Sequence, residues 1–314
     1  MIVTVTLNPS IDRTIGVADL RIGSVNRAEL IRLDAGGKGV NVSRALQMFG
    51  APTHAIYVGA ALGGSWFADV LTQAGVAHTM CMADGVTRSN ITLVESDGTV
   101  TKINEPGVTL TAQTIVDVEN ALGALDLHGA WVVFAGRLNP GAPEDTYLKL
   151  AKFAAARGAR IAIDVSGRPL AVALEQGGVD LIKPNQHELG EIVGRELKTV
   201  GDVIVAAREV IALGVSTVVC SLGADGALYV TANDMVHAEP AVRIQGTPVG
   251  AGDILLATFI GAGADADALV TAVQWSAASV ALPGTAIPTP EQAAAIPVSR
   301  HDSVDEHRTL VEVS

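Results

Sequence analysis

The pattern of apolar and polar positions alternates along the chain between two periods. Short apolar runs rich in β-branched residues predict buried strands, and Ala-rich stretches with apolar residues three and four apart predict helices between them. Strands are expected at Ile2–Leu7, Ala55–Val58, Ala130–Phe134, Ile161–Val165, Leu181–Ile182 and Thr217–Ser221. Helices are expected at Gly39–Phe49, Ser65–Ala74, Ala112–Leu122, Pro143–Ala156 and Val200–Ala212. The alternation predicts an α/β fold with a doubly wound, mostly parallel sheet, whose ligands bind beyond the carboxyl ends of the strands.

Two regions depart from this rhythm, at about residues 10–34 and 87–104. Both alternate polar and apolar residues and contain few helix formers. The second holds Ser96-Asp97-Gly98-Thr99, which predicts a hairpin turn between Asn90–Glu95 and Val100–Ile103. We expect the two regions to form a small antiparallel sheet that serves as a lid on a single domain spanning residues 1–314. The charged tail, Ser299–Ser314, is expected to be peripheral.

Charge and cysteine content narrow the classes of partner. The net charge of −12 argues against binding to nucleic acid or to an anionic membrane, so an anionic ligand needs a local cluster of Lys and Arg. Cys81 and Cys220 lie in apolar contexts and are interpreted as reduced core residues of a cytoplasmic protein. The chain opens on a strand pattern rather than a signal peptide, and its longest uncharged run, residues 268–290, predicts a buried helix and a loop rather than a membrane span.

The most informative segment is Gly250-Ala251-Gly252-Asp253, followed directly by an apolar helical stretch. Small residues let the backbone approach a ligand, and the unpaired amides of a helix N-terminus attract anions. A carboxylate beside such an anion site is suited to take a proton from an attacking hydroxyl, which suggests phosphoryl transfer to an alcohol. The simpler interpretation is that Asp253 is an N-cap and the glycines only form a turn.

A second glycine-rich segment, Ala35-Gly36-Gly37-Lys38-Gly39-Val40-Asn41, opens another predicted helix. It is not a Walker A loop, because Gly39 rather than Ser or Thr follows Lys38. Its glycines permit close backbone approach, while Lys38 supplies charge and Asn41 supplies an amide near the helix start. The alternative is an ordinary turn before a helix.

Taken together, six segments resemble the phosphofructokinase B-type carbohydrate kinases of the ribokinase-like fold, in the family's order and over nearly the whole chain. They are residues 6–12 (TLNPSID), 35–41 (AGGKGVN), 87–90 (TRSN), 183–188 (KPNQHE), 221–226 (SLGADG) and 248–253 (PVGAGD). The opening segment and the lysine of Gly-Gly-Lys-Gly most resemble the branch that phosphorylates phosphorylated ketohexoses. The resemblance implies transfer of the γ-phosphoryl group of MgATP, most simply to fructose 1-phosphate to give fructose 1,6-bisphosphate. It also implies a homodimer joined through the lids. It leaves open whether the enzyme requires a monovalent cation.

The resemblance also implies roles for single residues. It assigns Asp253 as the general base and Gly250, Ala251 and Gly252 as the anion hole. It places Asp12, Gly36, Gly37 and Asn41 at the sugar, and Asn185, Ser221, Gly223 and Gly226 at ATP. Glu188 would organise Mg²⁺ through water, although Asn185 and Glu188 also have the spacing of a helix capping box.

Four cations are candidates for the substrate phosphate: Lys38, Arg88, Lys102 and Arg137. Arg88 can bind a phosphate through two donors, whereas the lysines act as point charges, and exposed lysines often contact only solvent. Arg137 departs from the family, which commonly carries a small Ser there; it can add a phosphate ligand or narrow the pocket. Ile254 and the loop Ala281–Gly284 also depart, and the loop lacks the Asn often found near the adenine.

Several other functions stay open from the sequence. The acceptor can be tagatose 6-phosphate, fructose 6-phosphate or an unphosphorylated sugar or nucleoside. A catalytically silent sugar-phosphate sensor on the same fold is a second class, against which the intact Asp253 argues. A dinucleotide oxidoreductase is disfavoured, because Gly59–Gly64 lacks the required glycine spacing.

Overall fold

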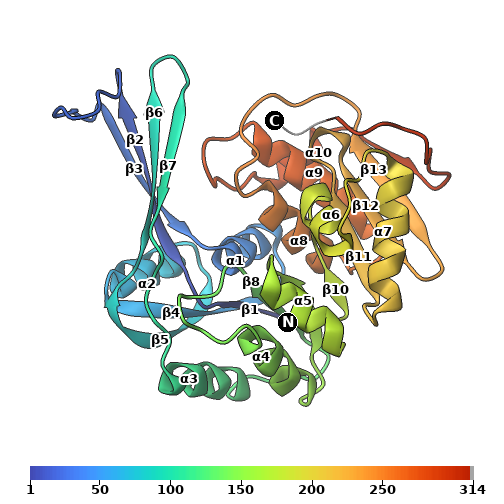
Figure 1. Cartoon of the computed structure of the whole chain (residues 1–314), viewed down its shortest axis with the longest axis horizontal. Helices are drawn as coiled ribbons and strands as arrows, with labels where there is room; N and C mark the ends of the chain where they lie inside the picture. Colours follow the sequence, from blue (N-terminus) through green and yellow to red (C-terminus); the bar gives the residue numbers. More distant parts are fainter. Residues whose placement is uncertain (312–314) are drawn as a thin grey trace.

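The computed structural model describes residues 1–311 and is built around a ten-stranded sheet of order β14-β13-β12-β11-β10-β9-β8-β1-β4-β5 (Figure 1). The strands from β5 across to β11 are parallel, whereas β12, β13 and β14 continue the sheet antiparallel. Their bounds are β1 Ile2–Thr6, β4 Thr53–Leu62, β5 Ala77–Val86, β8 Trp131–Ala135, β9 Arg160–Asp164, β10 Leu181–Ile182, β11 Thr217–Ser221, β12 Ala227–Thr231, β13 Met235–Pro240 and β14 Val298–His301. The predicted α/β class and mostly parallel sheet are confirmed.

Helices cover both faces of this sheet, because the central strands are apolar on both sides. On one face, Val3, Val5 and Phe134 pack in the core made with α3 to α7; on the other, Ile2 and Val133 pack in the core made with α1, α8 and α9. Every predicted helix is present, Val200–Ala212 with the predicted bounds and the others with one or both ends shifted. The bounds are α1 Lys38–Phe49, α2 Gly64–Gln73, α3 Ala112–Gly123, α4 Thr146–Ala155, α5 Arg168–Gln176, α6 Gln186–Val193, α7 Val200–Ala212, α8 Ala251–Gly261, α9 Ala268–Val280 and α10 Pro290–Ala294.

The two irregular regions form a separate four-stranded sheet, called the small sheet below, which projects from the body of the molecule (Figure 1). Its order is β3-β2-β6-β7, with bounds β2 Ser10–Val17, β3 Leu30–Gly36, β6 Ser89–Glu95 and β7 Val100–Asn104. The predicted hairpin is confirmed, but the prediction of an antiparallel sheet is wrong at its centre, where β2 and β6 run parallel. The reason is that each region forms its own antiparallel pair, β2 with β3 and β6 with β7. The two pairs meet at β2 and β6, which run in the same direction.

The C-terminal tail is the second correction, because it is not peripheral. Its first residues form β14, which extends the main sheet beside β13. Further on, Leu310 is 6% exposed and belongs to the main hydrophobic core, and Arg308 makes ion pairs with Asp225 and Glu239. Residues 312–314 of this predicted segment lie outside the described part. The charge pattern was misleading because the charged groups pair with partners far away in the sequence.

Among residues 1–311, no helix combines the length and apolar character needed to cross a membrane. The long uncharged run forms α9 and the loop after it, as predicted. Cys81 and Cys220 are both free and buried.

Candidate active site

Two helix N-termini come together near the carboxyl ends of the parallel strands. Helices α1 and α8 pack against each other, and each begins after a glycine with positive φ, +113° at Gly37 and +79° at Gly250. Neither N-cap supplies a side-chain hydrogen bond, so first-turn amides remain available to a ligand, except that of Ala251, which donates to the Pro248 carbonyl oxygen at 3.1 Å. The positive φ explains why glycine is needed at both positions. Together the two helix ends form a site suited to anions.

Asp253 lies in the first turn of α8 and is 7% exposed. Its Oδ2 accepts a hydrogen bond of 2.8 Å from Asn41 Nδ2, in the first turn of α1. Burial, with repulsion from Asp164, raises the pKa of Asp253 to about 6, although Asn41, Lys38 and Lys183 favour the ionised form. At neutral pH the carboxylate is therefore mostly ionised and yet basic enough to accept a proton.

A buried carboxylate, Asp164, holds two lysines beside Asp253. Lys38 Nζ lies 2.8 Å from Asp164 Oδ1, and Lys183 Nζ lies 3.6 Å from Asp164 Oδ2. Burial opposes ionisation of Asp164, but the charges of Lys183 and Lys38 outweigh it and keep its pKa below the ordinary value. Burial likewise opposes the charge on Lys38, and Asp164 outweighs it and raises the pKa of Lys38. The pairing places two lysine side chains at the helix N-termini.

These groups line a cavity of about 590 Å³. Its polar lining includes Lys38, Lys183, Asn185, Glu188, Ser221, Gly223, Gly226 and the segment Gly250–Asp253. Its apolar lining includes Pro240, Ile244, Val273, Ala277 and Val280. A cavity lined by cations, amides and apolar side chains suits a ligand with a polyphosphate and a flat base. The residues predicted for ATP thus lie on one cavity, and their contact with ATP stays a prediction.

Asn185 and Glu188 form the capping box at the start of α6. Asn185 Oδ1 accepts from the Glu188 amide at 2.8 Å, and Glu188 Oε2 accepts from the Asn185 amide at 2.9 Å. Both residues also line the cavity. The geometry therefore allows the motif to cap the helix and to face a ligand at the same time. The cap fixes the Glu188 carboxylate through its Oε2 atom.

On the side of the small sheet, the predicted sugar-binding residues form a second polar group. Asp12 Oδ1 accepts hydrogen bonds from Ser10 Oγ at 2.7 Å and Asn90 Nδ2 at 2.9 Å. Burial raises the pKa of Asp12 despite these bonds. A side chain at Gly36 would collide with the Asp12 carboxylate, which explains the glycine there. Asn41 is 8% exposed, and its Oδ1 has no hydrogen-bond partner in the described part of the chain. An unpaired buried acceptor beside Asp253 is suited to a hydroxyl.

The four predicted phosphate ligands lie on different elements of the fold. Arg88 donates to the carbonyl oxygens of Asn8 and Glu105 and to Asn90 Oδ1, at 3.1–3.2 Å. Burial lowers the pKa of Arg88, and the charge of Arg137 adds to the effect, so these two guanidinium groups are electrostatic neighbours. A bound dianion would relieve their repulsion. Lys102 lies on the exposed strand β7, on the face of the small sheet that carries Asn90. Lys38 is paired with Asp164, and its contact with the substrate phosphate stays a prediction.

Sequence reasoning missed Asp164, Lys183, Ser10 and Asn90 as members of the site. A signal for Asp164 was present, because a carboxylate inside a buried strand pattern requires a partner. Lys183, Ser10 and Asn90 lie within the segments that carry the resemblance, but their contacts depend on which strands become neighbours.

The comparisons with known proteins agree with this geometry. Residues 5–292 match the pfkB family of carbohydrate kinases. The chain is 39% identical to a 1-phosphofructokinase of Xanthomonas campestris, with 81% of both chains covered, and 36% identical to a 1-phosphofructokinase of Rhodobacter capsulatus, covering 94% of this chain and 95% of that protein. It superimposes on a crystal structure of phosphofructokinase-2 from Escherichia coli in complex with potassium with a TM-score of 0.88 and 29% identity, covering 94% of this chain and 97% of that one. Another structure of that protein is described as its tetrameric inhibited form.

The chain therefore belongs to the pfkB family of carbohydrate kinases and has the ribokinase-like fold. It is an enzyme of the phosphotransferase class.

Proposed function

We propose that this enzyme transfers the γ-phosphoryl group of ATP to fructose 1-phosphate and forms fructose 1,6-bisphosphate and ADP. The observation that carries the proposal is Asp253, with a pKa of about 6, in the first turn of a glycine-initiated helix and beside two lysines. The names of the Xanthomonas and Rhodobacter relatives support fructose 1-phosphate as the acceptor.

In the proposed reaction, Asp253 accepts the proton of the acceptor hydroxyl as that oxygen forms a bond to the γ-phosphorus. The bond from the γ-phosphorus to the bridging oxygen of ADP breaks, and the amides of Gly250, Ala251 and Gly252 stabilise the transferred charge, with the Ala251 amide exchanging its bond to the Pro248 carbonyl oxygen for one to the phosphoryl group. Lys38 and Lys183 neutralise the phosphates of ATP. Arg88 and Arg137 hold the phosphate of the acceptor, while Asp12, Gly36, Gly37 and Asn41 hold its hydroxyls. The small sheet serves as the lid that excludes water.

Two cations fit the donors present. Mg²⁺ keeps much of its hydration shell, so Glu188 would hold it through water, and bound Mg²⁺ supplies charge neutralisation to the phosphates. A monovalent cation near Gly250 would meet Thr285 Oγ1, a buried oxygen with no partner in the described residues. We place the enzyme in the cytoplasm, where ATP is available and Cys81 and Cys220 stay reduced.

A homodimer joined through the small sheets is part of the proposal. Ile31, Leu33 and Ile103 share one face of the small sheet by strand register, and they are 57%, 47% and 53% exposed. An exposed apolar face of this kind is typical of an interface.

The test is an ADP-release assay with MgATP and a panel of acceptors: fructose 1-phosphate, fructose 6-phosphate, tagatose 6-phosphate, fructose, ribose and adenosine. We expect turnover with fructose 1-phosphate to exceed that with every other acceptor. Preference for fructose 6-phosphate would favour the second candidate, 6-phosphofructokinase, which the similarity to phosphofructokinase-2 supports. Preference for a neutral acceptor would overturn the assignment of Arg88, and no turnover with any acceptor would favour a silent sensor.

A further inference from the structure

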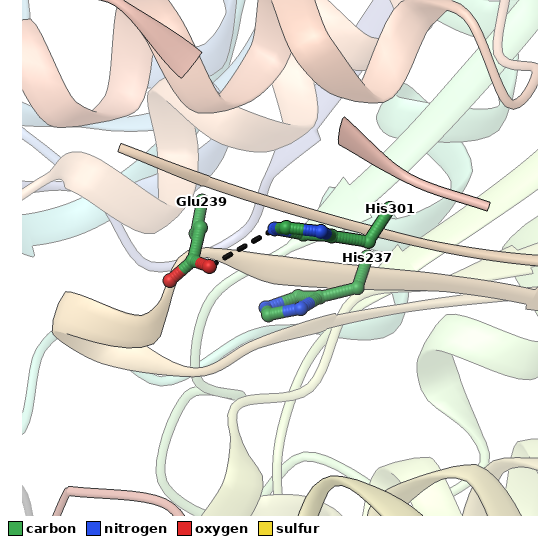
Figure 2. Close-up of side chains that lie close together, drawn as sticks. All are labelled: His237, Glu239 and His301. Carbon is green, nitrogen blue, oxygen red and sulfur yellow. Dashed lines mark hydrogen bonds and ion pairs between the residues drawn. The ribbon is translucent and has the colours of Figure 1, made fainter. Parts of the chain in front are cut away.

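Behind the cavity, three side chains that could ligate a metal lie together: His237 and Glu239 on β13 and His301 on β14 (Figure 2). The two imidazole rings are stacked with centroids 5.5 Å apart, and His301 Nε2 lies 3.0 Å from Glu239 Oε1. The Glu239 carboxylate, however, accepts two hydrogen bonds from Arg308, at 2.7 and 2.6 Å. With its carboxylate held by a guanidinium, the cluster is suited to a polar network rather than to a metal.

This network ends on Asp225, a buried residue of the loop Leu222–Gly226. Asp225 Oδ1 accepts from Arg308 Nη2 at 2.8 Å, and Oδ2 accepts from the amide of Val311 at 2.8 Å. The carbonyl oxygen of Asp225 accepts from His237 Nε2 at 2.7 Å. All three acceptors of this residue are therefore bonded, two of them by the C-terminal segment.

The opposite side of the same loop faces the cavity. Ser221, Gly223, Ala224 and Gly226 line it, so the loop lies between the ATP cavity and the network around Arg308. Backbone hydrogen bonds close the loop itself, from the Leu222 amide to the Gly226 carbonyl oxygen at 2.8 Å and from the Asp225 amide to the Leu222 carbonyl oxygen at 3.1 Å. The groups that hold Asp225 add to these bonds and fix the loop from the side away from the cavity.

The C-terminal segment is itself held elsewhere. The carbonyl oxygen of Arg308 accepts from the Val200 amide at 3.0 Å, and the Leu310 amide donates to the Lys198 carbonyl oxygen at 2.9 Å. The side chain of Leu310 is buried in the main core. Removing the contacts to Asp225 therefore leaves the segment anchored, so its effect on the loop can be measured separately from its folding.

We propose that Asp305–Val311 is a nucleotide-positioning strap, which orders the loop Leu222–Gly226 through Arg308 and the Val311 amide. The proposal rests on the proposed function in one respect, that the cavity binds ATP. A loop that is already ordered binds its ligand more tightly, because binding then loses less conformational entropy. Arg308 and Asp225 are positioning residues, since neither is proposed to contact the groups that react.

The test compares Arg308→Gln and Val311→Pro with Arg300→Gln. The first removes the guanidinium and the second removes the amide donor without changing charge. Arg300 is the matched control, because it lies on the same tail, pairs with Asp302 and with Asp267 at the start of α9, and has no hydrogen bond to Asp225. Calorimetry with a non-hydrolysable ATP analogue is expected to show a Kd raised about tenfold in both strap variants and unchanged in the control. The KM for fructose 1-phosphate should change less than about twofold, since the strap does not reach the sugar side.

Hydrogen exchange on the wild-type enzyme gives a second readout that needs no variant. Coupling is reciprocal, so the saturating ATP analogue should slow exchange of the Leu310 and Val311 amides. The proposal is overturned if the analogue leaves this exchange unchanged, if both strap variants bind it like wild type, or if nucleotide and sugar affinities fall equally. If one variant fails to fold, the other variant and the exchange data still test whether the strap orders the loop. Failure of the proposed function is a different result: wild type would not turn over fructose 1-phosphate, while the ratio of nucleotide Kd values would still report on the strap.

Discussion

The side-chain amide of Asn41 donates a 2.8 Å hydrogen bond to Asp253 Oδ2, linking the first turns of two helices that are 212 residues apart in the sequence. The same amide leaves its carbonyl oxygen, Oδ1, without a partner. A sugar hydroxyl that donates to this oxygen would lie beside the carboxylate that is proposed to deprotonate it. The pair therefore connects substrate binding with the base.

Asp253→Asn is expected to lower kcat by about 10²- to 10⁴-fold, because the variant cannot accept the proton of the acceptor hydroxyl. Binding of an ATP analogue should change little. Asp302→Asn, on an exposed ion pair, is the matched control and should keep wild-type turnover. Turnover of Asp253→Asn at the wild-type rate would contradict the proposed base.

The free energy of unfolding should also depend on pH through the Asp253 carboxyl group. The folded-state pKa of Asp253, about 6, lies above the ordinary 3.8, so the folded protein holds this proton more tightly than the unfolded chain. Its contribution to the free energy of unfolding is greatest below about pH 4, falls as pH rises to about 6, and stays constant above, a difference of about 3 kcal/mol. In urea unfolding, the free energy of unfolding of Asp253→Asn relative to that of wild type should therefore be higher at about pH 8 than at about pH 4.5. A difference that does not change with pH would contradict the raised pKa.

Asp164→Asn should change both stability and the pH profile. It leaves Lys183, which is 5% exposed, without its counter-charge, and we expect the free energy of unfolding to fall by about 3 kcal/mol. It also removes a repulsion that raises the pKa of Asp253. In wild type the rate should rise with pH through about 6 as Asp253 ionises, and this rise should move to lower pH in the variant. A rise at unchanged pH would show that Asp164 does not act on Asp253.

Arg88→Ala should weaken binding of the acceptor phosphate. Loss of a charge-assisted contact of about 1.5–3 kcal/mol raises the KM for fructose 1-phosphate by one to two orders of magnitude, with little change in the KM for ATP. Arg137→Ala should act in the same direction, because the two guanidinium groups are electrostatic neighbours. Arg21→Ala, on an exposed ion pair of the small sheet, is the control. Equal KM values in Arg88→Ala and wild type would point to an acceptor without a phosphate.

Leu33→Asp tests the proposed dimer, since it puts a charge on the exposed apolar face of the small sheet. Sedimentation velocity should show a dimer for wild type and a monomer for the variant, whereas Met48→Asp, at a helix position 45% exposed, should stay dimeric. A wild-type monomer, or a dimer that survives Leu33→Asp, would contradict an interface at this face.

Much of the fold could be predicted because its signals are local. The alternation of apolar runs and amphipathic stretches has a fixed period, so strands such as Leu181–Ile182 and helices such as Val200–Ala212 follow from neighbouring residues. The turn at Ser96–Thr99 and the capping box at Asn185 and Glu188 can also be predicted from residues a few positions apart in the sequence. The glycines before α1 and α8 are local signals as well, since their positive φ values restrict what can replace them.

Other relationships arise only in the tertiary structure. Lys38 pairs with Asp164, 126 residues away, because the order of the strands places the end of β9 beside the start of α1. The parallel joining of β2 and β6 and the pairing of Arg308 with Asp225 have the same origin. By itself the sequence determined many of the strands and helices and the glycine-initiated helix starts, since both depend on neighbours along the chain. The tertiary structure decided which charges meet, and hence the pKa of Asp253, because charge pairing and burial depend on distances in space between residues that are distant in sequence.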